Sequence, residues 1–98
     1  MGLSDKISTN LFSEAWMTDK LLSVEIKSPE KEVWKGTAKS VSSINSAGPF
    51  DILPFHANFI TIIENQAIKI IGTSSKEEYK FENAIIYASN NNVFIYTL

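Results

Sequence analysis

Hydrophobic and polar residues alternate along much of the chain after residue 20. Leu22, Val24 and Ile26 are separated by single polar residues, which predicts a strand with one face in a core and the other in water. The run 59–63 is almost continuously apolar, so we expect that strand to be buried on both faces. The pattern predicts further strands at 33–44 with an interruption at Gly36, and at 50–53, 68–70, 78–82, 84–88 and 93–98.

Turn signals separate these segments. Ser28-Pro29-Glu30-Lys31 contains a proline that presets the backbone for a turn, and Asn45-Ser46-Ala47-Gly48-Pro49 is the strongest loop signal in the chain. Residues 64–65, 72–76 and 90–92 supply further turns. Short strands, closely spaced turns and the lack of a long helical period predict an all-β fold, an antiparallel β-sandwich.

Residues 1–20 form a polar leader that differs from the rest. The leader carries one apolar cluster, made of Leu11, Phe12, Ala15, Trp16 and Met17. Because these positions repeat at three and four residues, one alternative is a short amphipathic helix capped by Asn10 or Ser13. The other is an irregular leader that packs its aromatic residues loosely on the sandwich. Residues 21–98 then make up a single β-sandwich domain.

Charge and composition narrow the classes of function. The 98 residues carry 9 basic and 11 acidic side chains, a net charge of -2, which attracts no phosphate backbone and makes nucleic acid a poor partner. The chain has no cysteine, so disulfides and thiolate chemistry are excluded. Its apolar runs are too short to cross a bilayer, and it starts without the pattern of a signal peptide. We therefore expect a cytoplasmic location.

The sequence offers little chemistry. His56 is the single histidine, which argues against a histidine-based metal site. Asp51 lies nearby, and a serine could in principle complete a Ser-His-Asp set, but no nucleophile-elbow sequence is present. Gly36, Gly48 and Gly72 are too scattered to form a phosphate-binding loop. We expect no catalytic residues, no metal and no cofactor.

The stretch from Gly48 to Thr61 is more specific than a plain sandwich requires. It reads Gly-Pro-Phe-Asp-Ile-Leu-Pro-Phe-His-Ala-Asn-Phe-Ile-Thr, and two prolines flank its predicted strand. Rigid loops on a β scaffold commonly present recognition surfaces. This stretch resembles the loop, strand and corner motif of the epsilon subunit of F-type ATP synthases, called delta in mitochondria. Residues 22–30, 68–70 and 92–95 resemble other strands of that family, so the resemblance covers about residues 21–98.

The sequence departs from the family pattern in four places. Phe55 stands where the family usually has glycine, and Glu82-Asn83 replaces the usual Gly-Gly. The leader is longer than the typical start. The chain stops at Leu98, without the family's C-terminal helical hairpin. The inhibitory and nucleotide-binding roles of that hairpin are therefore not carried over.

The resemblance implies a non-catalytic rotor subunit of the central stalk, which couples proton transport to ATP synthesis. By position, Ala47, Gly48 and Pro49 would face the c-ring, and the corner His56, Ala57, Asn58 and Phe59 would bind the gamma subunit. The chain would then be peripheral to the cytoplasmic face of the energy-coupling membrane, held there through the complex without inserting directly.

Two other hypotheses remain open from the sequence. The first is a free-standing β-sandwich interaction or regulatory module, with Phe12 and Trp16 of the leader as its partner-binding element. The second is a small hydrolase built around His56, which requires activity that His56→Ala abolishes without loss of fold.

Overall fold

The computed structural model describes residues 20–98, and the short helix considered around residues 11–17 of the leader falls outside this range. Within it, the chain forms strands only, separated by short turns. They are β1 (Leu22–Lys27), β2 (Glu32–Ala38), β3 (Ser40–Asn45), β4 (Gly48–Ile52), β5 (Phe59–Glu64), β6 (Ala67–Ile71), β7 (Lys76–Lys80), β8 (Asn83–Ser89) and β9 (Asn92–Thr97). No helix among the described residues is long and apolar enough to cross a membrane.

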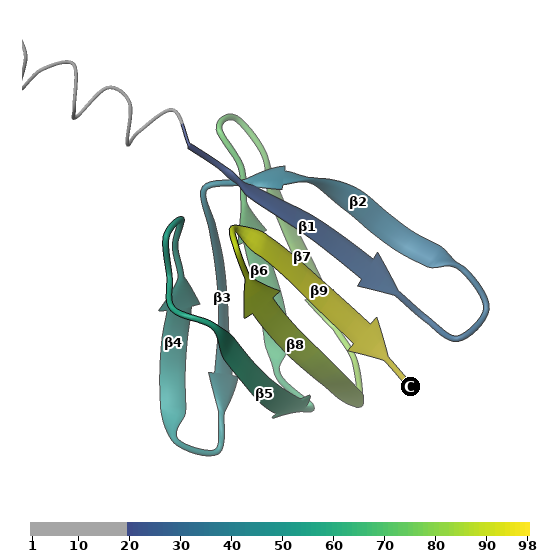
Figure 1. Ribbon diagram of the computed structural model, residues 1–98. Helices are drawn as coiled ribbons and strands as arrows, with labels where there is room; N and C mark the ends of the chain where they lie inside the picture. Colours follow the sequence, from purple (N-terminus) through teal and green to yellow (C-terminus); the bar gives the residue numbers. More distant parts are fainter. Residues whose placement is uncertain (1–19) are drawn as a thin grey trace, which may run out of the picture.

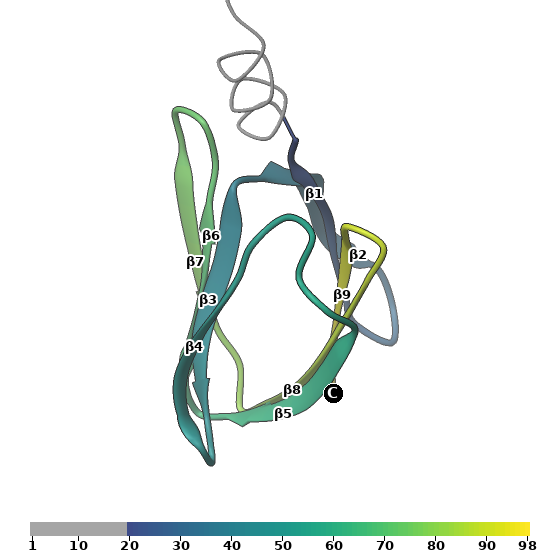
Figure 2. The ribbon, with the colours of Figure 1, turned by 60° about the vertical axis from the view of Figure 1, so that its left-hand side comes forward.

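The strands form two sheets that face each other, as Figure 2 shows. The five-stranded sheet has the order β2-β1-β9-β8-β5, and the four-stranded sheet has the order β4-β3-β6-β7 (Figure 1). The predicted β-sandwich is thus confirmed. One pair, β1 with β9, is parallel, an arrangement that a hairpin could not produce and that the long chain between the first and last strands allows.

The core lies between the sheets and is aliphatic. Every second residue of β1, β8 and β9 points inward, as the alternating pattern predicts. The buried hydrophobic residues are Leu22, Val24, Ile26, Ala38, Val41, Ile52, Ile63, Ile68, Ile70, Ala84, Ile86, Ala88, Val93 and Ile95. One hydrogen bond links the two sheets: Asn45 Nδ2 on β3 donates to Thr61 Oγ1 on β5 at 3.0 Å. Within the four-stranded sheet, Ser43 Oγ on β3 donates to the Ala67 carbonyl on β6 at 2.9 Å.

The predicted interruption at Gly36 is wrong. β2 runs through Gly36 in register with Val24, and the chain changes sheets only at Lys39. Instead, the missing side chain of Gly36 leaves room for the Trp34 ring, because a Cβ at position 36 would lie 2.8 Å from that ring. The ring of Trp34 therefore packs over Gly36 and covers the inner side of this edge strand.

The expectation that 59–63 is buried on both faces is also wrong. β5 is an edge strand of the five-stranded sheet, and only alternate residues point into the sandwich. Ile63 is fully buried, whereas Ile60 and Ile62 are 67% and 61% exposed.

Candidate docking surface

The corner between β4 and β5 is a tight turn. Pro54 and Phe55 are its central residues, and the backbone N–H of His56 donates to the Leu53 carbonyl at 3.0 Å. Phe55 has a φ of 68°, the pattern of a type II turn with proline first and a left-handed residue second. Glycine is the usual residue there because a side chain in this conformation is strained, which explains the family's preference.

A second turn holds the corner in place. Asn90 and Asn91, between β8 and β9, have φ values of 52° and 62°, the pattern of a type I′ hairpin turn. Asn91 Oδ1 accepts the Phe55 N–H at 2.6 Å, and the Asn91 carbonyl accepts the Ser23 N–H at 2.9 Å. One asparagine thus joins the corner, the hairpin and the start of β1.

The corner residues proposed as a binding element are mostly at the surface. His56, Ala57 and Asn58 are exposed, and Phe59 is half-buried. His56 Nδ1 lies 2.7 Å from the Ala57 carbonyl oxygen, a contact in which the ring N–H donates. The edge of the His56 ring rests on Phe59 at a centroid distance of 5.6 Å, and Phe59 packs on Phe50 at 5.2 Å. These contacts orient the imidazole outward on an aromatic base.

The tip proposed as the second binding element is the β3–β4 hairpin. The Ala47 N–H donates to Asn45 Oδ1 at 2.9 Å, and Gly48 has a φ of 122° that favours glycine. Pro49 is exposed on the edge strand β4, where its missing N–H leaves no gap in the ladder. The tip and the corner lie at opposite ends of β4 (Figure 1), so they do not form one site.

An apolar surface that sequence reasoning missed lies beside both elements. On the outer side of the five-stranded sheet, two rows of side chains cross β5, β8 and β9. One row is Ile60, Tyr87 and Phe94, and the next is Ile62, Ile85 and Tyr96. We call these six residues the outer apolar face.

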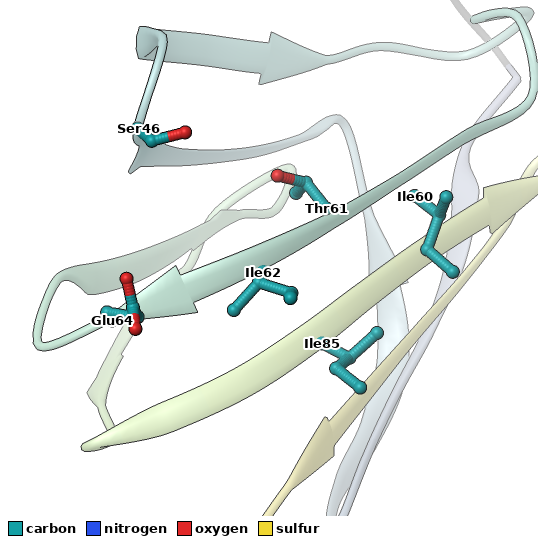
Figure 3. Close-up of a pocket in the computed structure, with 6 residues that line it drawn as sticks. All are labelled: Ser46, Ile60, Thr61, Ile62, Glu64 and Ile85. Atoms are coloured by element: carbon teal, nitrogen blue, oxygen red, sulfur yellow. The ribbon is translucent and has the colours of Figure 1, made fainter.

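The outer apolar face is open to solvent and continues toward the tip. Tyr87 and Tyr96 are 39% and 43% exposed, and both stack on Phe94 at centroid distances of 6.4 Å. Figure 3 shows a shallow groove along β5, lined by Ile60, Ile62 and Ile85, with Ser46, Thr61 and Glu64 also lining it. Apolar surface of this kind, rimmed by polar groups, commonly binds another protein.

The residues with potential for catalysis do not assemble. Asp51 accepts a hydrogen bond from Ser42 Oγ on the outer side of the four-stranded sheet, while His56 binds its own neighbour's carbonyl at the corner. Among residues 20–98, no three His, Cys, Asp or Glu side chains are grouped closely enough to hold a metal ion.

A small two-layer β-sandwich with an exposed apolar face and rigid end loops is typical of a domain that binds other proteins. Residues 21–97 match the family described as ATP synthase, delta/epsilon chain, β-sandwich domain, and the chain belongs to that family. The resemblance noted in the sequence is thereby confirmed.

A curated relative and two solved structures are similar to this chain. The ATP synthase epsilon chain of Endomicrobium trichonymphae is 37% identical over 70 residues, which is 71% of this chain and 51% of the relative. The chain thus spans about half the length of that relative. The fold matches a chain in the Tetrahymena thermophila mitochondrial ATP synthase central stalk and c-ring (TM-score 0.68, 13% identity, 81% of this chain and 64% of that one). It also matches a chain in the Euglena gracilis mitochondrial ATP synthase assembly of OSCP, F1 and c-ring (TM-score 0.72, 10% identity, 79% and 50%).

Proposed function

We propose that this chain is a non-catalytic rotor subunit of the central stalk of an F-type ATP synthase, docking on the gamma subunit and the c-ring. Membership of the delta/epsilon family supports a place in the synthase. The observation that carries the docking role is the outer apolar face, where Ile60 and Ile62 are more than half exposed on a rigid sheet. A preformed surface loses little conformational entropy on binding, which favours a stable complex.

The gamma subunit would bind at the corner and the outer apolar face together. The corner His56, Ala57, Asn58 and Phe59 runs directly into Ile60, so one partner surface can cover both. Its contact would be apolar over β5, β8 and β9 and polar around His56 and Asn58. An apolar centre with a polar rim is the usual anatomy of a stable protein interface.

The c-ring would bind at the tip made of Ala47, Gly48 and Pro49. This tip lies at the other end of β4, and at roughly 3.3 Å per residue Gly48 is about 13 Å from Ile52. Two partners can therefore be held at once without competing for the same loop. Torque would pass between them through the close-packed aliphatic core, which deforms little under load.

The remaining parts of the proposal follow from this place in the complex. The chain would sit on the cytoplasmic face of the energy-coupling membrane, peripheral and without direct insertion, and would bind neither nucleic acid nor a cofactor. It would contribute to ATP synthesis by coupling rotation to proton transport and would catalyse no step itself.

Co-expression with the gamma subunit of the same organism tests the proposal. A tagged gamma subunit should retain this chain through size-exclusion chromatography at one-to-one stoichiometry. Addition of detergent-solubilised c-ring should then yield a ternary complex, which Ala47→Trp at the exposed tip should weaken while the gamma complex stays intact. Failure of the folded chain to bind its gamma subunit would contradict the proposal and favour the free-standing module.

A further inference from the structure

The outer apolar face occupies only part of the five-stranded sheet. The strands β5, β8 and β9 contribute Ile, Tyr and Phe side chains to it. On β1, the next strand, the outward residues are polar and include Glu25 and Lys27, whose charged groups pair at 3.4 Å. The apolar area therefore has a sharp border, with a polar strand beside Phe94 and Tyr96.

Residues 11–17 have the composition to cover such an area. Leu11, Phe12, Ala15 and Trp16 are apolar and are spaced so that a helix would gather them on one side. Ser13 and Glu14 would then fall on the opposite, solvated side. This segment lies outside the described residues 20–98.

The connection to β1 brings the segment within reach of the outer apolar face. Leu22 begins β1, and Ser23 is paired with Asn92 at the start of β9. Tyr87 on β8 lies in the same cross-strand row as Glu25 on β1, two strands away. With about 4.8 Å between strands and 3.3 Å per residue along a strand, Tyr87 is roughly 14 Å from Leu22. The five residue steps from Met17 to Leu22 span up to about 17 Å. No rearrangement of the sheet is needed.

We propose that the leader, through Leu11, Phe12, Ala15 and Trp16, packs on the outer apolar face when the gamma subunit is absent, and that gamma displaces it. The role of gamma rests on the proposed function, whereas the contact of the leader with the sheet stands independently of it. Packing would remove exposed isoleucine and aromatic surface from water, which is favourable by roughly 25 cal/mol for each Å² buried. It would also limit self-association of a chain with a net charge of only -2.

Disulfide trapping in the isolated chain tests the packing, because the natural sequence contains no cysteine. Ala15→Cys is combined with Tyr87→Cys on the outer apolar face, or with Lys35→Cys as the matched control. Lys35 is exposed and pairs with Glu25, so it is one strand from β1 while Tyr87 is two strands away. A leader that only diffuses on its tether would reach Lys35 at least as readily.

The expected result is an intramolecular disulfide with Tyr87→Cys that forms about tenfold faster than with Lys35→Cys, because packing raises the effective concentration at one site only. Equal rates, or faster trapping at Lys35→Cys, would overturn the proposal. So would disulfides that form chiefly between two molecules, since a second copy would then be the occupant.

Tryptophan emission gives a second measurement that leaves Tyr87 intact. In a Trp34→Phe background, Trp16 is the single tryptophan, and its emission should shift to longer wavelength when Ile60→Asp is added. Ile44→Asp, on the outer side of the other sheet, should leave the emission unchanged. An unchanged spectrum with Ile60→Asp would contradict the proposal. Both tests omit gamma, so their failure would leave gamma docking untouched.

Discussion

The backbone N–H of Phe55 donates a hydrogen bond to Asn91 Oδ1 at 2.6 Å, although 36 positions separate the two residues. This bond fixes the corner that begins β5 against the hairpin that joins β8 and β9. The first corner residue proposed to bind gamma, His56, follows Phe55 directly. Its position therefore depends on a side chain from a distant turn.

Removing the Asn91 acceptor should destabilise the corner. Asn91→Gly keeps the left-handed backbone of the turn but loses the bond to Phe55, so the free energy of unfolding should fall by about 1 kcal/mol. Asn90→Gly is the matched control, because Asn90 lies in the same turn and its side chain does not hold the Phe55 N–H. Urea denaturation of both variants measures the difference. Equal losses would show that the bond contributes nothing.

The left-handed backbone of Phe55 makes that position sensitive to the shape of the side chain. Phe55→Val should be about 1–2 kcal/mol less stable than Phe55→Asn, since β-branched residues are strained at a φ of 68° and asparagine tolerates it. Both variants remove the aromatic ring, so their comparison isolates the backbone effect. Thermal unfolding followed by circular dichroism measures it. Equal stability of the two variants would refute the strain at this turn.

The contact of Trp34 with Gly36 should make Gly36→Ala costly. The new Cβ would lie 2.8 Å from the Trp34 ring, which has to move, so we expect a loss of about 1–3 kcal/mol and a change in Trp34 emission. The emission is read in a Trp16→Phe background. Gly72→Ala is the control, because its close neighbour is the end of the flexible Ser75 side chain. A loss at Gly36 no greater than at Gly72 would contradict the account.

Tyr79 should make the domain sensitive to alkaline pH. Burial raises the pKa of the Tyr79 phenol above its ordinary value of 10.0, and the nearby Glu77 carboxylate raises it further. The folded state therefore holds this proton more tightly than the unfolded chain does. The stability that the protonated Tyr79 phenol contributes is fully present below pH 10 and is lost as the pH rises through the raised pKa of the folded state.

Urea unfolding between pH 9 and pH 11 checks this direction. Tyr79→Phe should flatten the alkaline loss of stability, and Tyr87→Phe, on the outer apolar face, should retain it. An unchanged alkaline slope in Tyr79→Phe would show that Tyr79 is not the group responsible.

Local pattern was sufficient to predict the strands but not their neighbours. The alternation of Leu22, Val24 and Ile26 defines an inward face wherever β1 lies, so the fold class followed from the sequence. The run 59–63 was harder to interpret, because an edge strand with an apolar outer face and a central strand have nearly the same composition. Only Thr61 hinted at alternation, and strand order is set by long-range pairing that no local window contains.

The sequence indicated the loop residues of the candidate site but not its residues on the five-stranded sheet. The two prolines and Gly48 marked the tip and the corner, since each has a distinct backbone requirement. The outer apolar face joins Ile60, Tyr87 and Phe94 from three strands, and these residues become neighbours only through the register of the sheet. The predicted strand 50–53 already separated the tip from the corner, and in the structure the two lie at opposite ends of β4.

The affinity for the gamma subunit of variants on opposite sheets tests the central claim most directly. Ile60→Asp places a charge on the outer apolar face, and Ile44→Asp makes the same change at an exposed isoleucine of the other sheet. Titration calorimetry with purified gamma should show binding about 30-fold weaker or worse for Ile60→Asp and near-native binding for Ile44→Asp. If Ile60→Asp, shown by circular dichroism to be folded, binds gamma as tightly as the natural chain does, the outer apolar face is not the docking surface.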